Sequence, residues 1–190
     1  MPLKELREIK GGAELGIWKL TERVSELESL MSEEVATEKY KRFNHDLRRL
    51  EWLGARALMS KMGLKKTLQY TEHGKPFYPL GPKISISHSK DFIAIITHPE
   101  NEVGIDVQEV VDKVRRIKHK FCNAHELDWA TSDEDFTIIW SAKEALFKVK
   151  ERNVLFKEDI QVSRPENGQL HITYKEIQAY SGVLLSLKDY

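Results

Sequence analysis

The chain has 190 residues, 41% hydrophobic and 32% charged, which suits a globular protein of one domain or two small lobes. Its 30 Lys and Arg balance 30 Asp and Glu, which argues against nucleic-acid binding driven by bulk positive charge. With Cys122 as its single cysteine, the sequence excludes an intramolecular disulfide and a Cys-rich zinc site, and we expect a reducing, cytoplasmic setting. The first residues lack the apolar core of a signal peptide and no apolar run could cross a membrane, so we expect neither a leader nor a membrane span.

Hydrophobic spacing and turn residues outline the first half of the chain. The elements predicted there are, in chain order, a strand around Leu15–Leu20, a helix from Glu22 to Met31, a long helix over much of Val35–Met62 with a break near Asn44, a turn at Gly74-Lys75-Pro76, and a hairpin of strands Lys83–His88 and Phe92–His98. Ser32, followed by two glutamates, is a typical helix N-cap, and Gly63 is a typical helix stop.

The second half begins with an apolar segment and contains the longest helical pattern of the chain. The elements predicted there are a strand Glu102–Val107, helices at about Asp112–Phe121 and His125–Thr131, a long helix Asp133–Lys150, strands Ile160–Ser163 and Gln169–Tyr174, and a last strand Gly182–Leu187.

The two halves resemble each other weakly. Trp, Ala and Leu recur at the same offsets in Trp52–Met59 and Trp140–Phe147, and Arg56 corresponds to Glu144. Coincidence is one explanation, because Ala and Leu are common in helices. The other is an α+β pseudo-dimer of two similar lobes, residues 1–101 and 102–190. Each lobe would be a long helix packed on a small antiparallel sheet, and a ligand cleft would lie between the lobes. Such a protein could act as a monomer with pseudo-twofold symmetry.

Strand alternation groups the side chains of the segment before Gln108 into two faces. Val103, Ile105 and Val107 share an apolar face, and Asp106 and Gln108 share the polar face. Solvated polar residues on an exposed strand would look the same. A carboxylate and an amide aimed together into a polar cleft would be a candidate metal or ligand site.

The long helix Asp133–Lys150 carries an apolar stripe of Ile139, Ala142, Leu146 and Val149, with a second apolar edge at Trp140 and Phe147. Glu144 and Lys148 lie beside that edge at a spacing of four residues. An ordinary intrahelical ion pair explains this spacing, but little of the helix is left to face water. Two carboxylates, Asp106 and Glu144, in a chain without a Cys or His cluster suit a hard cation such as Mg2+.

Several basic and hydroxyl residues could bind an anionic ligand. Lys75 lies in a Gly/Pro loop, and Ser87 and His88 end a strand beside a turn, where turn chemistry alone could explain them. A basic cluster includes Lys39 and Arg42, and a solvated helix face is the ordinary reading of such a cluster. The basic residues between Lys113 and Lys120 could serve a protein partner in the same way.

Taken together, these motifs resemble the 4′-phosphopantetheinyl transferases, specifically the larger, surfactin-synthetase-activating type. Gly104-Ile105-Asp106-Val107 is similar to the first family signature, and Trp140 to Lys148 is similar to the second, W-S-x-K-E-A-x-x-K. Gly74-Lys75-Pro76 and Ile86-Ser87-His88-Ser89 match the upstream motifs in the expected order. The resemblance covers roughly Lys39 to Lys150.

The resemblance implies an enzyme that transfers the phosphopantetheine arm of coenzyme A to a serine of an apo acyl or peptidyl carrier protein, releasing adenosine 3′,5′-bisphosphate. It implies Asp106 and Glu144 as Mg2+ ligands. It also implies Glu144 as acceptor of the serine proton and Lys148 as the group that stabilises the pyrophosphate or the leaving group.

For coenzyme A itself, the resemblance implies that the phosphates are contacted by Lys75, Ser87 and His88, the last at the 3′-phosphate. Lys39 and Arg42 are further candidates for that group.

Gln108 departs from the family pattern, since many members carry Glu there. Its amide could hold the metal weakly, directly or through a water, but adds no negative charge, so we expect weaker Mg2+ affinity than in a three-carboxylate site. This departure keeps a second hypothesis open, a non-catalytic module that binds coenzyme A or a carrier protein. A third is another Mg2+-dependent phosphoryl-transfer enzyme, although the sequence lacks a Gly-rich Walker loop.

Overall fold

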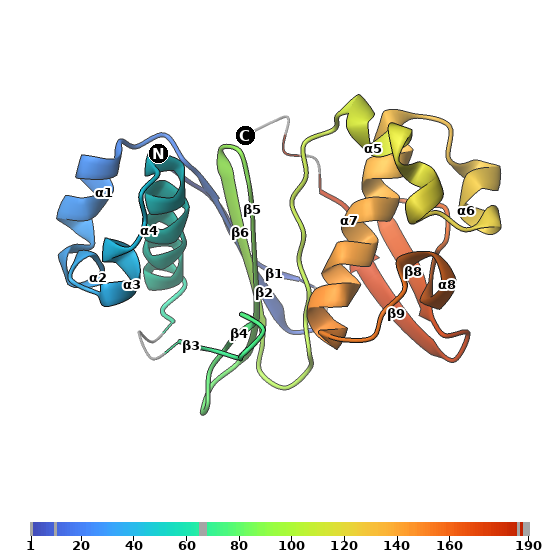
Figure 1. Ribbon diagram of the computed structural model, residues 1–190. Helices are drawn as coiled ribbons and strands as arrows, with labels where there is room; N and C mark the ends of the chain where they lie inside the picture. Colours follow the sequence, from blue (N-terminus) through green and yellow to red (C-terminus); the bar gives the residue numbers. More distant parts are fainter. Residues whose placement is uncertain (1, 10, 65–67, 186, 188–190) are drawn as a thin grey trace. The chain divides into compact units, whose positions relative to one another are not determined.

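A computed structural model describes residues 2–9, 11–64, 68–185 and 187 of the chain (Figure 1). The chain divides into two compact units, Met1–Val107 and Gln108–Tyr190. This boundary comes later than the expected one at 101/102. As a result, Asp106 belongs to the first unit and Gln108 to the second.

The first unit combines an antiparallel sheet with helices. Its strands are β1 (Leu3–Ile9), β2 (Ala13–Lys19), β3 (Gln69–Tyr70), β4 (Pro76–Phe77), β5 (Lys83–Ser89) and β6 (Phe92–His98), and its helices are α1 (Val24–Leu30), α2 (Ser32–Val35), α3 (Glu38–Lys41) and α4 (Asp46–Lys61). Four strands form a sheet in the order β1-β2-β6-β5, and β3 pairs with β4. The helix α4 contacts β2 and β6 (Figure 1).

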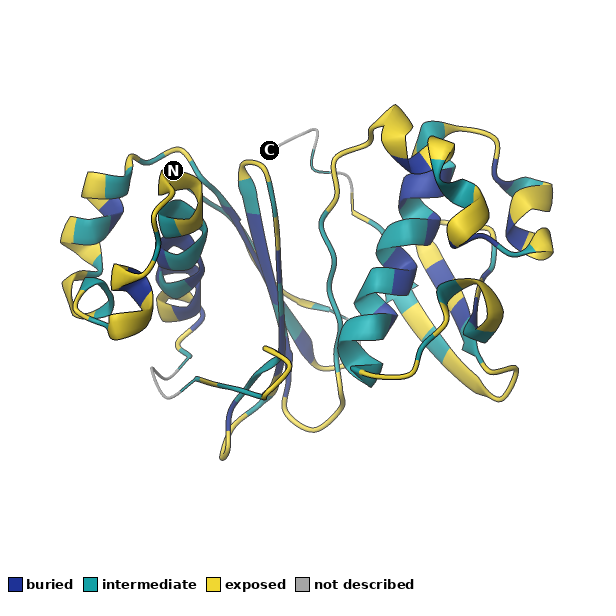
Figure 2. Cartoon of the chain, in the orientation of Figure 1, coloured by how far each residue is buried: buried dark blue, intermediate teal, exposed yellow. Residues whose placement is uncertain are grey.

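The core of this unit lies between α4 and the sheet. Leu53 and Leu58 of α4 are fully buried in one cluster with Ile93 and Ile95 of β6. Gly54 brings the helix close to the strand, because a Cβ there would come within 2.6 Å of the Ile93 side chain. Figure 2 shows α4 exposed at its two ends and buried or partly buried over the turns between them, where it packs on the sheet.

The second unit packs helices on a three-stranded antiparallel sheet of order β7-β8-β9. Its elements are α5 (Asp112–Arg116), a 3-10 turn (Lys118–Lys120), α6 (Ala124–Trp129), α7 (Asp133–Lys150), α8 (Phe156–Asp159), β7 (Ile160–Val162), β8 (Gln169–Tyr174) and β9 (Gln178–Val183). Ile139, Ala142 and Leu146 of α7 are buried in the core of this unit and Val149 packs against it, which confirms the predicted apolar stripe. The mixed helix and antiparallel-sheet architecture is confirmed in both units, and their internal equivalence stays a prediction.

The helix expected over much of Val35–Met62 corresponds to α3 and α4, and the break expected near Asn44 is confirmed between them. Thr37 caps α3 by accepting a hydrogen bond from the Tyr40 amide. One predicted strand is displaced. The last strand is β9, Gln178–Val183, rather than Gly182–Leu187, of which part lies outside the described residues.

The strand β1 was missed because its apolar residues are spaced by three, at Leu3, Leu6 and Ile9, and do not alternate. It lies at the edge of the described sheet, paired with β2, where a buried apolar face is not required.

The segment Glu102–Val107 is not a strand. It joins no sheet, and the expected alternation of burial is absent, since Val103, Ile105 and Val107 are partly buried like Asp106. None of the helices in the described ranges is both long and apolar enough to span a bilayer.

Candidate functional site

Two serines of β5 hold the segment that carries Asp106. The Ser85 hydroxyl accepts a hydrogen bond from the Ile105 amide over 3.1 Å, and the Ser87 hydroxyl accepts one from the Val107 amide over 3.2 Å. Both serines are buried, at 4% and 5% exposure. The two serine hydroxyls therefore accept the amide hydrogen bonds that backbone carbonyls would accept in a sheet. The segment is held beside β5 in this way without being a strand of the sheet.

The Ser87 hydroxyl also touches the candidate metal ligand. It donates a hydrogen bond to Asp106 Oδ1 over 3.1 Å while it accepts the one from Val107. A hydroxyl can do both at once, because it has one proton and two lone pairs. Ser87 thus contacts both the backbone and the carboxylate of the segment and orients Oδ1 of Asp106.

His88 points to the other face of the sheet. Neighbouring residues on a strand alternate between faces, and His88 pairs with Ile93, whose side chain packs against α4. Its Nδ1 lies 3.0 Å from Oε1 of Glu51 on α4. Ser87 and His88, adjacent in sequence, therefore contact different parts of the unit from opposite faces of β5: Ser87 the segment with Asp106, and His88 the helix α4.

Lys75 lies in the loop before β4 and forms an ion pair with Glu102 over 3.0 Å. Glu102 also pairs with Lys83 of β5 over 2.9 Å. Partial burial acts to raise the pKa of Glu102, but the hydrogen bonds from Lys83 and Lys75 outweigh it and lower the pKa below its usual range. Glu102 therefore ties the loop of Lys75 to the start of the segment that carries Asp106.

Lys39 lies over aromatic rings rather than in open solvent. Its Nζ is 3.6 Å from the centre of the Tyr70 ring and 4.7 Å from that of Trp52. Burial and the nearby Arg56 guanidinium lower the pKa of Lys39. Arg42, which follows α3, is exposed.

Arg56 of α4 was given no binding role from the sequence, but it contacts the same two aromatic side chains as Lys39. Its guanidinium carbon stacks 3.2 Å from the centre of the Trp52 ring, and its Nη2 donates a hydrogen bond to the Tyr70 hydroxyl. Arg56 lies four residues after Trp52 on one helix, and this spacing could have predicted that the two side chains are in contact.

The helix α7 starts at a capping box. The Ser132 hydroxyl accepts a hydrogen bond from the Asp135 amide, and the Asp135 carboxylate accepts one from the Ser132 amide. Burial acts to raise the pKa of Asp135, but hydrogen bonds from Thr131 and Ser132 outweigh it and lower the pKa. This cap fixes where the helix begins and hence which side chains of α7 face the core.

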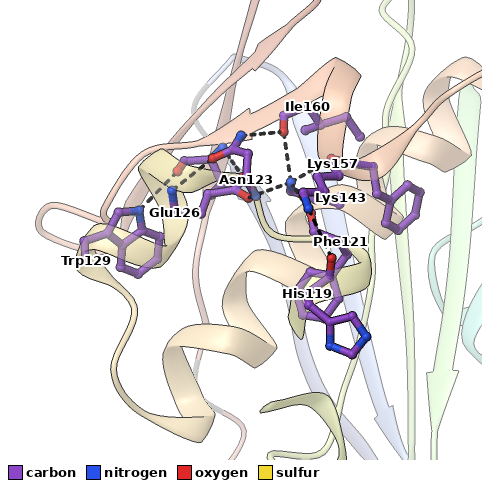
Figure 3. Close-up of polar contacts among 10 residues, drawn as sticks. His119, Phe121, Asn123, Glu126, Trp129, Lys143, Lys157 and Ile160 are labelled. Carbon is purple, nitrogen blue, oxygen red and sulfur yellow. Dashed lines mark hydrogen bonds and ion pairs between the residues drawn. The ribbon is translucent and has the colours of Figure 1, made fainter. Parts of the chain in front are cut away.

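Lys143 anchors α7 from inside the core (Figure 3). Its ammonium is fully buried and lies 2.7 Å from Oε2 of Glu126, which is fully buried as well. It also donates to the backbone carbonyl oxygens of Phe121, Phe156 and Ile160. Burial lowers the pKa of Lys143, and the Glu126 carboxylate acts against this shift.

The partner of Lys143 was not predictable from local spacing, since Glu126 lies on another helix, α6. Glu126 Oε1 accepts a further hydrogen bond from the Val162 amide of β7, and Oε2 accepts one from the Asn123 amide. The Glu126–Lys143 pair therefore joins α6, α7 and β7 in the interior of the second unit. Charges at such depth are retained only where they are paired and hydrogen-bonded, as they are here.

Glu144 and Lys148 are the other candidate site residues on α7. Both are partly exposed, whereas Lys143, adjacent to Glu144, is fully buried. Gln108, the first residue of the second unit, is exposed. Within the described part of the chain, no three His, Cys, Asp or Glu side chains are placed to hold one metal ion.

The chain is similar to known proteins of one family. A sequence profile of the 4′-phosphopantetheinyl transferase superfamily matches residues 102–189. The 4′-phosphopantetheinyl transferases AcpT of Escherichia coli O157:H7 and K12 are each 31% identical to this chain over 147 residues, 70% of this chain and 73% of theirs. AcpT of Salmonella typhi is 30% identical over 113 residues, 54% of this chain and 59% of its own.

Proposed function

Since the chain belongs to the 4′-phosphopantetheinyl transferase family, which moves phosphopantetheine from coenzyme A to carrier proteins, we propose that it is a Mg2+-dependent member of the larger, surfactin-synthetase-activating type. In the reaction, the hydroxyl oxygen of a carrier serine forms a bond to the phosphorus that bears the pantetheine arm. The bond from that phosphorus to the bridging oxygen breaks, and adenosine 3′,5′-bisphosphate leaves.

Asp106 carries the proposal. Carboxylate oxygens suit a hard cation, the Ser87 hydroxyl orients the carboxylate of Asp106, and Asp106 lies in the first family signature. We assign the other oxygen ligands to Glu144 and, weakly or through a water, to Gln108. The assignment of these three side chains to one ion is based on their positions in or beside the two family signatures. A bound Mg2+ would neutralise charge on the phosphoryl oxygens and on the leaving group.

Glu144 and Lys148 supply the remaining chemistry on α7. Glu144 accepts the serine proton, directly or through a water, and Lys148 stabilises the pyrophosphate or the departing phosphate. Their partial exposure leaves them accessible to a substrate, and the buried Lys143 holds the helix that carries them. Lys75 binds the phosphates of coenzyme A as well.

His88 is assigned to the 3′-phosphate, with Lys39 and Arg42 as further candidates. Ser87 and His88 serve opposite faces of β5, so one strand end can meet two different parts of a ligand. Coenzyme A has two separate anionic groups, the pyrophosphate and the 3′-phosphate. We assign the pyrophosphate to the side of Ser87 and Asp106, and the 3′-phosphate to the side of His88.

The partner is an apo acyl or peptidyl carrier protein, and the basic residues between Lys113 and Lys120 are a docking candidate. We propose a monomer that acts in the cytoplasm, without nucleic acid or membrane as partners.

The test is a mass-shift assay. The full-length protein is incubated with coenzyme A, Mg2+ and a panel of apo carrier proteins, and each carrier is weighed by mass spectrometry. We expect one phosphopantetheine adduct on a carrier serine, lost when a chelator replaces Mg2+. A carrier whose target serine is changed to alanine is the matched control. No mass gain on any carrier would count against the proposal.

Gln108 favours a second candidate, a non-catalytic module that binds coenzyme A or a carrier. The exposed amide supplies no negative charge where many relatives have a carboxylate. Calorimetry that finds tight coenzyme A binding, together with a mass-shift assay that finds no transfer to any carrier, would favour this candidate.

A further inference from the structure

Glu51 of α4 is a partly buried carboxylate between two basic side chains. Its side chain is 10% exposed, with Oε1 3.0 Å from His88 Nδ1 and Oε2 2.8 Å from Nη1 of Arg48. Arg48 lies one helical turn earlier, and His88 lies at the end of β5. The carboxylate thus connects the helix to the strand end at which the 3′-phosphate of coenzyme A is proposed to bind.

The Glu51 contact determines which ring nitrogen of His88 carries a proton. A carboxylate can only accept, so Nδ1 must donate its hydrogen to Oε1. In a neutral ring with Nδ1 protonated, Nε2 carries a lone pair and would repel a phosphate oxygen. Only the imidazolium presents an N–H at both nitrogens, one to Glu51 and one to a phosphate oxygen.

His88 is accessible to a ligand, whereas Glu51 is not. His88 is 42% exposed and can reach a ligand, whereas Glu51 is almost covered and sits behind the ring. Arg48 offsets the negative charge of Glu51, which reduces its repulsion toward a bound phosphate.

We infer that Glu51 is a positioning residue that orients the His88 ring toward the 3′-phosphate of coenzyme A. The inference rests on the proposed function, and in particular on His88 as the residue that contacts this phosphate. It makes Glu51 a determinant of how the protein distinguishes coenzyme A from dephospho-coenzyme A, which lacks the 3′-phosphate.

The test compares KM and kcat for these two substrates in the transfer assay. We expect Glu51→Gln, which keeps an acceptor for Nδ1 but removes the charge, to raise KM for coenzyme A about fivefold. KM for dephospho-coenzyme A and kcat for both substrates should not change. Glu51→Ala, which removes the orientation as well, should raise KM for coenzyme A further. Glu166→Gln, an equal change of charge at an exposed turn of the second unit, is the control and should leave both KM values unchanged.

Combination with His88→Ala separates positioning from a general structural effect. In the His88→Ala protein, Glu51→Gln should have no further effect on KM for coenzyme A. An equal rise of KM for both substrates, an unchanged KM, or an effect that persists without His88 would each overturn the inference. A wild-type protein that transfers but does not distinguish the substrates would overturn it too, and would leave the transferase standing. A wild-type protein that transfers nothing would instead refute the proposed function.

Discussion

The Ser87 hydroxyl donates a hydrogen bond to Oδ1 of Asp106 over 3.1 Å and accepts one from the Val107 amide. Ser85, two residues earlier on β5, accepts a hydrogen bond from the Ile105 amide in the same way. The two serines thus have matched structural roles, and of the two, Ser87 holds the carboxylate.

We therefore expect Ser87→Ala and Ser85→Ala to differ in function but not in stability. Each should lower the free energy of unfolding by about 1–3 kcal/mol, because each leaves a backbone amide without its acceptor. Ser87→Ala alone should also raise the Mg2+ concentration needed for half-maximal transfer several-fold, because Asp106 loses its donor. Urea unfolding and Mg2+ titrations of the transfer rate measure the two effects. An equal Mg2+ requirement in both variants would contradict the role of Ser87.

Asp106→Ala and Glu144→Gln should each nearly abolish transfer while the fold stays intact. Both side chains are partly exposed, so their removal should change the free energy of unfolding by only about 0.5 kcal/mol. The mass-shift assay and circular dichroism check these two expectations. Full activity in either variant would refute the role assigned to that residue.

Gln108→Glu should reduce the Mg2+ requirement. A third carboxylate adds negative charge near the proposed ion, and carboxylate oxygens are preferred ligands of Mg2+. We expect half-maximal transfer at a several-fold lower Mg2+ concentration, whereas Gln108→Ala should raise that concentration slightly. An unchanged or higher requirement in the Gln108→Glu variant would place residue 108 outside the metal site.

Lys143→Met should destabilise the second unit by about 3–5 kcal/mol, because it leaves the buried Glu126 carboxylate without its partner. Replacing both residues, with Glu126→Gln and Lys143→Met together, should recover part of this loss. Urea unfolding of the single and double variants forms the measurement. Glu144→Gln, the change at the next residue, is the control. If Lys143→Met is no less stable than Glu144→Gln, the buried pair does not anchor the helix.

The cap of α7 should make stability depend on pH in acid. The pKa of Asp135 is lower in the folded protein than in the unfolded chain, so the folded state favours the ionised carboxylate. Its contribution is complete above the unfolded value of about 4 and is lost as the pH falls through the lower folded value. Asp135→Asn should therefore cost up to about 1 kcal/mol at pH 7 and progressively less below pH 4. Unfolding curves across this range test it, and a difference that grows in acid would contradict it.

Elements with a strong local pattern could be predicted. The helix Asp133–Lys150 and the hairpin before Asp106 were expected within a residue of their ends, because hydrophobic spacing and turn residues mark them. The helix stripe that buries Leu146 and leaves Glu144 partly exposed followed from the same periodicity.

Contacts over long sequence separations could not be predicted. Glu102–Val107 was predicted as a strand because its apolar residues alternate, but the amides of Ile105 and Val107 donate to serine hydroxyls about twenty residues away and not to a neighbouring strand. Lys143 received no role because its carboxylate partner lies on another helix. Glu51 received no role from the sequence, because only the packing of α4 on the sheet brings His88 to it.

Because Ser87 and His88 lie on opposite faces of β5, their order in the sequence determines which of them contacts Asp106 and which contacts Glu51. Exchanging the two residues would leave composition and net charge untouched, yet it would turn an imidazole toward Asp106 and a hydroxyl toward Glu51, so that both contacts would be lost. Inserting or deleting one residue between Lys83 and Ser87 would have the same effect through a shift of register. Mutational tolerance at this strand end should therefore be lower for changes of length or order than for conservative changes of residue type. A search for distant relatives would do better to require Ser-His as a dipeptide than to count the two residues separately.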